Sequence, residues 1–390
     1  MIIDMKFEKN QLSNQKNKEG VDLANNGNKD LAYEYFLDAI NLNPEYPVPY
    51  FNLGNIFMER KLYIKAIENF KKSILLDKNN DKYKFRLGIA YAESQEFKKS
   101  IKIFEEILKE DSMNLEILNN LGRLNKEISS YKTSIKYFER AILINHKFHK
   151  PHTELGVLYG ELGHIEKSIK AFNKALSIKK TFIDNNVLKE KELINNKSEL
   201  ATIYYNLSLS NLLSNNYNDG FKQYEYRIYK ENPVRPHARP ISERITNKIS
   251  IQNKKKILLI SEQGLGDTIQ FVRYSKYLRN VGFDVTLCVL DKLHALFKFS
   301  NVCDNLISQV DAEKVYDTPW ASLLSLPNLL NISSQNVLVK DKYLTVPKER
   351  IKKWERILKK DKKPLIGINW QGNPNIEKGN VKGRSIPLDE

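Results

Sequence analysis

The stretch that decides the fold is YFNLGNIF, residues 50–57, because the chain repeats it at a fixed interval. Related phrases are KFRLGIAY at 84–91, LNNLGRLN at 118–125 and HTELGVLY at 152–159, each 34 residues after the one before. The glycine of the phrase occurs five times in register, at Gly20, Gly54, Gly88, Gly122 and Gly156. Such a period is typical of a repeat protein, in which each unit buries its apolar face only against its neighbours.

Two further positions share the period. Twelve residues after each glycine stands a small residue, and sixteen residues after it a phenylalanine: Ala32, Ala66, Ser100, Ser134 and Ser168, then Phe36, Phe70, Phe104, Phe138 and Phe172. This pattern predicts two antiparallel helices per repeat, with the small residues at the close approach and the aromatic ring between one pair and the next. A sixth copy has Ser208 and Tyr224 at the glycine and phenylalanine positions, after 18 extra residues around 181–198. We expect these extra residues to form a loop and an extension of the next helix.

The pattern resembles the tetratricopeptide repeat. That resemblance implies a right-handed solenoid of about six repeats with a concave groove for a protein partner. Two polar rows are candidates for this groove: Asn52, Asn120 and Asn206, then Glu59, Glu93, Glu127 and Glu161. The first row resembles the asparagine ladder of O-linked N-acetylglucosamine transferase, but Arg86 and Glu154 interrupt it. The second row fits either a solvated stripe or an acidic track for a basic peptide.

Composition narrows the class of partner and the compartment. The net charge is +16, but the lysines are scattered among glutamates, so we expect no nucleic-acid partner. Two cysteines, Cys288 and Cys303, give no disulfide framework and favour a reducing compartment. The N-terminus lacks the apolar core of a signal peptide, and no apolar run reaches membrane-spanning length. We therefore expect a cytoplasmic protein without a transmembrane segment.

Three histidines resemble a metal-ligand set, because His146, His149 and His152 are spaced three apart. The phrase around them contains no acidic or thiol ligand, and a closed zinc site needs four converging ligands. We expect Pro151 to interrupt any shared helical face, and His152 to serve in packing. The sequence thus predicts neither a metal site nor a cofactor.

Prolines mark a change of organisation, since Pro233, Pro236 and Pro240 cannot continue a helix. We expect a tail at 1–14, the repeat array at 15–230, a linker at 231–253 and a second domain at 254–390. Strand-like segments of the second domain alternate with helix-like ones: 254–261, 284–290, 303–308 and 363–370, against 266–282, 292–300, 322–331 and 349–360. Such alternation predicts an α/β domain with a parallel sheet.

The phrase SEQGLGDT, residues 261–268, follows the first of these strands. Gly264 and Gly266 permit a tight turn at a helix N-terminus, which favours an anion, although Ile269 replaces the third glycine of a dinucleotide fingerprint. Asp267 fits two roles. It suits the N-cap of a helix beginning near Thr268, and it suits a catalytic carboxylate.

Several phrases of the second domain occur in a recognisable order: EQGLGDTIQFVRY, PWASLLSLPNLL, KYLTVP, IGINWQGNPN and GRSIPL. Together they resemble bacterial tetratricopeptide-repeat proteins with a C-terminal glycosyltransferase-like domain, related to the heptosyltransferases of the GT-B architecture. This resemblance implies a Rossmann-like N-terminal half and an inverting, metal-independent transfer of a sugar from a nucleotide-sugar to an acceptor hydroxyl. It implies that Asp267 is the catalytic base. The substrate- and donor-binding residues it implies are Gly264, Gly266, Gln371, Gly372, Asn373 and Arg384.

The chain departs from that family at Glu390, where the second GT-B domain would begin. We therefore expect this chain alone to have no transferase turnover, and its status as an enzyme stays open. The leading interpretation is repeat-mediated protein binding joined to a glycosyltransferase-like domain. The alternative is a non-catalytic interaction scaffold.

Overall fold

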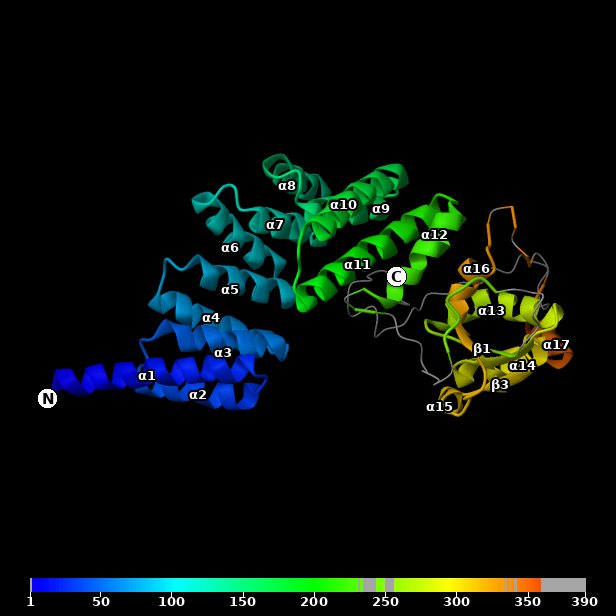
Figure 1. Cartoon of the computed structure of the whole chain (residues 1–390), viewed down its shortest axis with the longest axis horizontal. Coiled ribbons are helices and arrows are strands. Elements are labelled where there is room, and N and C mark those ends of the chain that lie inside the picture. Colours follow the sequence, from blue (N-terminus) through cyan, green and yellow to red (C-terminus); the bar gives the residue numbers. More distant parts are fainter. Residues whose placement is uncertain are drawn as a thin grey trace. The chain divides into compact units, whose positions relative to one another are not determined.

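The computed structural model describes residues 2–230, 232–233, 243–249, 256–333, 335–336, 338–339 and 342–358. The chain divides into two compact units, one built of helix pairs and one built around a small sheet (Figure 1). Each unit is described by itself below.

The helical unit consists of antiparallel pairs that follow one another along the chain, as the period of 34 residues predicts (Figure 1). The first helices of the pairs are α1 (Ile2–Asn25), α3 (Pro47–Glu59), α5 (Asp81–Glu93), α7 (Leu115–Glu127), α9 (His149–Glu161) and α11 (Glu190–Leu213). The second helices are α2 (Lys29–Leu42), α4 (Tyr63–Leu76), α6 (Phe97–Glu110), α8 (Tyr131–Ile144), α10 (Ile165–Asn185) and α12 (Tyr217–Tyr224). A short 3-10 turn, η1 (Glu225–Ile228), ends the last pair.

The recurring glycine and phenylalanine meet within each pair. All five phenylalanine rings are buried, at most 1% exposed. A Cβ atom added to Gly122 would lie 2.4 Å from the Phe138 ring, and the same clash recurs in the other four copies. The ring thus lies on the glycine of its own pair, and no larger residue fits beneath it.

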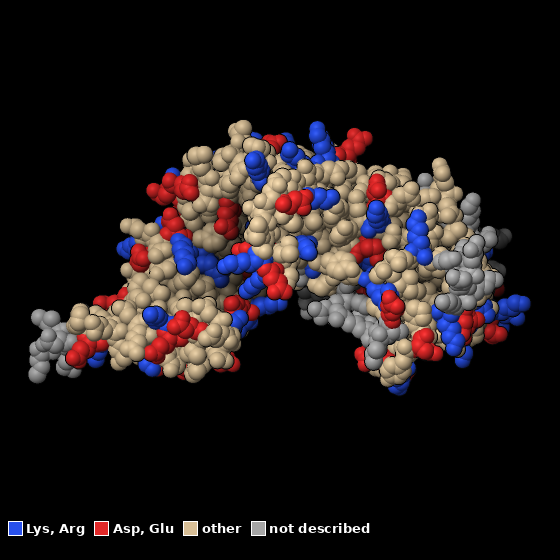
Figure 2. All heavy atoms as spheres, in the orientation of Figure 1, with Lys and Arg blue, Asp and Glu red and all other residues tan. Residues whose placement is uncertain are grey.

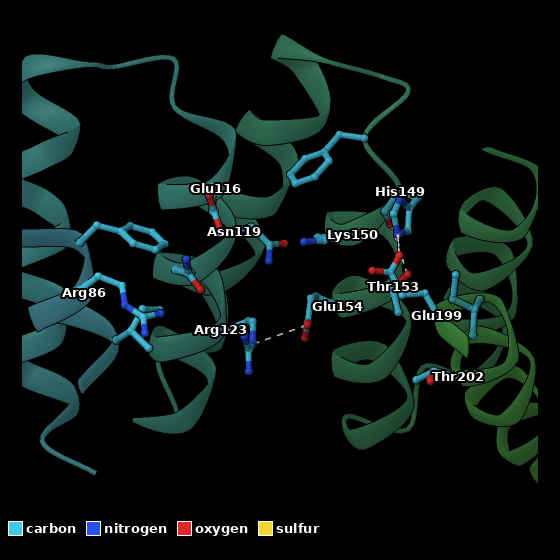
Figure 3. A pocket seen from close by; sticks show the side chains of 15 residues that line it. Arg86, Glu116, Asn119, Arg123, His149, Lys150, Thr153, Glu154, Glu199 and Thr202 are labelled. Carbon is cyan, nitrogen blue, oxygen red and sulfur yellow. Dashed lines mark hydrogen bonds and ion pairs between the residues drawn. The ribbon is translucent and has the colours of Figure 1, made fainter. Parts of the chain in front are cut away.

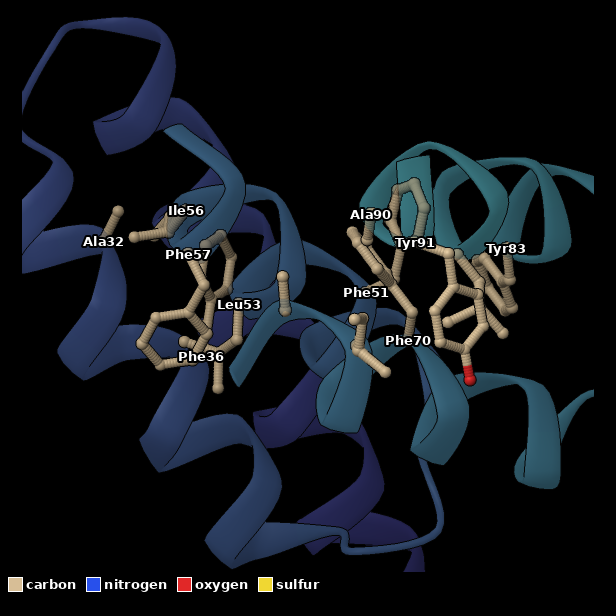
Figure 4. Close-up of a cluster of buried hydrophobic side chains, with 13 residues drawn as sticks. Ala32, Phe36, Phe51, Leu53, Ile56, Phe57, Phe70, Tyr83, Ala90 and Tyr91 are labelled. Carbon is tan, nitrogen blue, oxygen red and sulfur yellow. The ribbon is translucent and has the colours of Figure 1, made fainter. Parts of the chain in front are cut away.

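The rings also take part in packing between pairs. Phe70 shares a buried cluster with Tyr83 and Leu87 of the following pair. Figure 4 shows this cluster running from Ala32 and Phe36 at one end to Tyr83 and Tyr91 at the other. The predicted position of the ring between pairs is therefore only part of its role.

The small residues at the close approach add hydrogen bonds. The hydroxyls of Ser100, Ser134 and Ser168 each donate to the carbonyl of the glycine twelve residues earlier, at 2.7 Å. The earlier copies have Ala32 and Ala66 there, both fully buried. A methyl group or a hydroxyl therefore satisfies this position equally well in size.

Two expectations about the boundaries of the array differ from the structure. The extra residues before the sixth pair lengthen both α10 and α11, and residues 186–189 alone connect these helices. Residues 2–14 are not a separate tail, because α1 begins at Ile2. The buried hydroxyl of Ser13 donates to the carbonyl of Ala39 at 2.7 Å and fastens this part of α1 to α2.

Within its described residues, the second unit contains a four-stranded sheet in the order β3-β2-β1-β4, with every neighbouring pair parallel. Its elements are β1 (Lys256–Ile260), α13 (Leu265–Asn280), β2 (Asp284–Cys288), η2 (Asp291–Leu293), α14 (His294–Ser300), β3 (Asn305–Ile307), α15 (Gln309–Ala312), β4 (Trp320–Ser322), η3 (Leu323–Ser325), α16 (Leu326–Leu329) and α17 (Lys348–Leu358). The parallel sheet predicted from the alternating segments is confirmed. The predicted strand at 363–370 lies outside the described residues.

The edge of β4 is paired with a segment expected to be linker. The backbone N–H of Trp320 donates to the carbonyl of Glu243 at 2.9 Å, and that of Ile245 donates to the carbonyl of Trp320 at 2.7 Å. Residues 243–245 therefore belong to the sheet unit, although the proline-based prediction placed them in a linker at 231–253. Among the described helices, none combines the length and the apolar content needed to cross a bilayer.

Candidate functional site

A groove of about 520 Å³ lies in the helical unit, lined by side chains from α5, α7, α9 and α11 and by Phe148, which directly precedes α9 (Figure 3). These are first helices of their pairs, so the period of 34 residues brings equivalent positions side by side in the groove. Phe85, Ile89, Phe148 and Ile203 supply apolar surface, and the rest of the lining is polar or charged. Such a mixture of apolar walls and placed polar groups is typical of ligand sites.

Two charged side chains of the groove lining, Arg123 and Glu154, pair with each other. Arg123 Nε lies 3.6 Å from Glu154 Oε1, as the dashed line in Figure 3 marks. Burial raises the pKa of the Glu154 carboxyl, and the nearby Arg123 opposes that shift. At the α5 side of the groove, Arg86 Nε donates to Asn55 Oδ1 at 2.7 Å.

The α11 side is fixed by a three-residue cluster. Glu199 pairs with the ammonium of Lys179 from α10, and its Oε2 lies 3.3 Å from Nε2 of His149 on α9. Hydrogen bonds from His149 and Lys179 lower the pKa of Glu199 to about 2. Lys179 is only 4% exposed, so its charge depends on this carboxylate. The cluster therefore holds the extended part of α11 against α9 and α10.

Of the predicted asparagine row, Asn120 lines the groove. Asn52 lies elsewhere, where its amide donates to Asn17 Oδ1 at 2.8 Å, and Asn206 is not part of the lining. The prediction missed Asn119, which also lines the groove and is 7% exposed. A signal for Asn119 was present in the repeat itself, because three other copies have Phe51, Phe85 and Tyr205 at this position, although two have Asn17 and Thr153.

The predicted glutamate row lies at helix ends. Glu59, Glu93, Glu127 and Glu161 are the last residues of α3, α5, α7 and α9, and all four are exposed. A helix C-terminus disfavours an acidic residue. Two of these glutamates pair with a lysine, which offsets the unfavourable charge. Lys29 Nζ lies 2.6 Å from Glu59 Oε2, and Lys126 Nζ lies 3.6 Å from Glu161 Oε1. None of the four lines the groove, and the acidic track stays a prediction.

The histidine segment folds differently from the expectation. Helix α9 begins at His149, so Pro151 lies in its first turn, where a missing N–H costs no hydrogen bond. Pro151 therefore does not separate His149 from His152, which share the helix. His152 is partly buried, burial lowers its pKa, and its Nε2 makes no hydrogen bond. Within the described residues, no cluster of three His, Cys, Asp or Glu side chains could hold a metal ion.

In the sheet unit, α13 begins at Leu265 with Gly264 as its N-cap residue. Asp267 lies inside the first turn, three residues after the N-cap, so the N-cap interpretation of this residue is wrong. A Cβ atom added to Gly266 would meet nothing within 4 Å, so the start of α13 is open to approach on that side. Gln371, Gly372, Asn373 and Arg384 lie outside the described residues.

Comparison with known proteins agrees with the helical architecture. The tetratricopeptide repeat family profile matches residues 49–80, 115–147 and 150–182. Tetratricopeptide repeat protein 6 from Homo sapiens is 38% identical over 55 residues, which are 14% of this chain and 11% of that protein.

The solved structures that match part of this chain include MamA and PilW. The MamA crystal structure is 22% identical, with a TM-score of 0.39, over 42% of this chain and 96% of that chain. PilW, described as a widely conserved type IV pilus biogenesis factor, is 17% identical, with a TM-score of 0.41, over 56% of this chain and 91% of that chain. From the registered helix pairs and the matching profile, the N-terminal region is a solenoid of tetratricopeptide repeats.

Proposed function

We propose that the solenoid binds an extended segment of a partner protein in the groove between α5 and α11. The observation that supports this is Asn119, a buried residue of the groove lining whose Oδ1 makes no hydrogen bond among the described residues. Burying such an acceptor without a partner costs about 1–3 kcal/mol, so a bound segment that donates to it recovers stability. Apolar walls from Phe85, Phe148 and Ile203 provide surface for the segment's side chains.

Site-specific photo-crosslinking in the source cells tests this function. A photoreactive amino acid replaces Asn120 in the groove, and in a matched control it replaces Lys136, which is exposed on α8 away from the groove. We expect position 120 to yield a defined crosslinked peptide of one partner protein, and position 136 to yield none. Equal yields from both positions, or no crosslink at position 120, would contradict the proposal.

We propose a second function for the sheet unit, the transfer of a sugar with Asp267 as the base. Its support is the resemblance of the phrases around EQGLGDT, together with the place of this phrase directly after β1 of a parallel sheet. In open parallel sheets, ligands bind at the carboxyl ends of the strands. Asp267 lies in the first turn of α13, where the positive end of the helix favours negative charge on a ligand or a carboxylate.

The chemistry of this second function needs one proton transfer. The Asp267 carboxylate would take the proton of the acceptor hydroxyl as its oxygen bonds to the sugar carbon, while the nucleoside diphosphate leaves with the bonding electrons. General-base assistance contributes about 10²–10⁴ in rate. The open side of Gly266 leaves room for the acceptor to approach.

An assay of nucleoside diphosphate release tests the second function. It uses this chain together with a donor-binding second domain, the half of the GT-B fold that the resemblance implies. Release from a panel of nucleotide-sugars is expected, with Asp267→Asn abolishing it at unchanged thermal stability. A variant with the unsubstituted rate would remove Asp267 from the reaction and leave protein binding as the function.

A further inference from the structure

The groove holds a polar residue, Asn119, at a position where three other copies of the repeat place a ring and two place Asn17 and Thr153. Asn119 stands three residues before Gly122, and the equivalent residues include Phe51, Phe85 and Tyr205. Asn119 is only 7% exposed, and its Oδ1 has no hydrogen-bond partner among the described residues. Buried side-chain polar atoms nearly always find a partner. An apolar residue would pack here at lower cost, so the amide fits a donor that is supplied from outside the chain.

Two charges flank this amide without an ion pair among the described residues. Glu116 and Lys150 line the groove one repeat apart, at equivalent positions of α7 and α9. In the view of Figure 3, Asn119 lies between them.

The other charges of the groove are already engaged. Arg123 pairs with Glu154, Glu199 pairs with Lys179 and His149, and Arg86 is bonded to Asn55. Among the described residues, the groove therefore presents one acid and one base without an ion pair, Glu116 and Lys150, on either side of an acceptor without a donor.

The opposite charges of Glu116 and Lys150 favour some classes of ligand over others. A nucleic acid or another polyanion would meet Lys150 favourably and Glu116 unfavourably. A polypeptide can carry both signs and also supplies backbone N–H donors. Packed helices lie about 8–10 Å apart, and an extended chain rises about 3.3 Å per residue, so side chains about three residues apart would reach both charges.

We propose that the groove recognises a peptide segment with a basic side chain facing Glu116, an acidic side chain facing Lys150 about three residues away, and a donor for Asn119 Oδ1 between them. This inference rests on the proposed binding of an extended segment in the groove. It adds the charge pattern of that segment and the residues that read it.

Four fluorescent peptides of equal length test the pattern by anisotropy with the full chain. The peptides share one Gly/Ser sequence and differ only at two positions that are three residues apart. Two of them carry a basic and an acidic residue there, in opposite orders. The third carries two acidic residues and the fourth two basic residues. We expect one mixed-charge peptide to bind at least tenfold more tightly than either same-charge peptide. The double variant Glu116→Lys with Lys150→Glu should transfer the preference to the other mixed-charge peptide. The control Lys136→Glu on α8 should leave it unchanged.

Asn119→Leu adds a readout that damage to the fold would not give. We expect this variant to unfold at a higher temperature, because an unsatisfied buried acceptor is removed, and to bind the preferred peptide about tenfold more weakly. Equal binding of all four peptides, or a preference that the charge exchange leaves unmoved, would overturn the inference. If position 120 still crosslinks to a partner in that case, the proposed function stands and only the charge pattern fails.

Discussion

The ring of Phe138 lies directly on Gly122, with its Cε1 atom 2.4 Å from the place where a Cβ would be. Gly122→Ala should therefore destabilise the solenoid by about 1–3 kcal/mol, because a buried ring has no room to retreat in a close-packed core. The better helix propensity of alanine, up to about 1 kcal/mol, offsets only part of this. Urea unfolding followed by circular dichroism measures the loss.

A double-mutant cycle separates this clash from any general effect on α7. In a Phe138→Leu background the smaller side chain leaves space, so the added methyl should cost much less than in the unsubstituted chain. Additive losses in the two backgrounds would show that Gly122 is needed for another reason.

Ser134 allows a prediction of the opposite kind. Its hydroxyl donates to the Gly122 carbonyl, but the equivalent residues Ala32 and Ala66 do without one. Ser134→Ala should therefore cost no more than about 1 kcal/mol, the net contribution of an ordinary hydrogen bond. Ser134→Val should cost clearly more, because the residue is fully buried at the closest approach of α7 and α8. Equal stability of the two variants would contradict the claim that only a small side chain fits at position 134.

The fold was predictable from the sequence where the sequence repeats itself. Five copies of one glycine and one phenylalanine, in a constant register, placed five of the six described helix pairs, and Ser208 and Tyr224 at the same positions placed the sixth. β4 was missed because a strand of three residues, Trp320–Ser322, shows no period, and its pairing with Glu243 and Ile245 joins segments about 75 residues apart. Only tertiary contacts make these residues extended.

The groove was predictable in position but not in composition. The ladder position found Asn120, since equivalent residues of first helices share one face. Glu199 could not be found in this way, because it directly follows the extra residues around 181–198 and reaches the groove only through the lengthened α11. Asn119 is found by comparing copies, because it differs from Phe85 and Thr153, the equivalent residues in the adjacent copies.

The reactivity of the two cysteines measures how well the folded sheet unit protects them. Burial raises the pKa of Cys288 to about 12 and that of Cys303 to about 11, against an ordinary value of 9.0. Because the thiolate is the reactive form, at pH 8 Cys303 should react with iodoacetamide about 100-fold more slowly than an ordinary thiol, and buried Cys288 more slowly still. Mass spectrometry of timed samples measures both rates. Rapid labelling of Cys288 in the folded protein would show that β2 opens far more often than its burial implies.

The cluster around Glu199 predicts a stability that depends on acid pH. The pKa of Glu199 is lowered from 4.5 to about 2, so the folded state binds a proton less readily than the unfolded chain. Its contribution is therefore complete above the unfolded value and is lost as the pH falls from about 4.5 through 2. Glu199→Gln should flatten this part of the curve of unfolding free energy against pH, while at neutral pH it removes the partner of the buried Lys179 and lowers stability.

The exposed Glu166 on α10, whose carboxylate has no ion pair among the described residues, gives the matched control. Glu166→Gln should leave the acid limb of the curve unchanged. If the two variants fall in parallel between pH 4.5 and 2, the acid sensitivity arises from other carboxylates, and Glu199 does not fasten α11 to the wall of the groove.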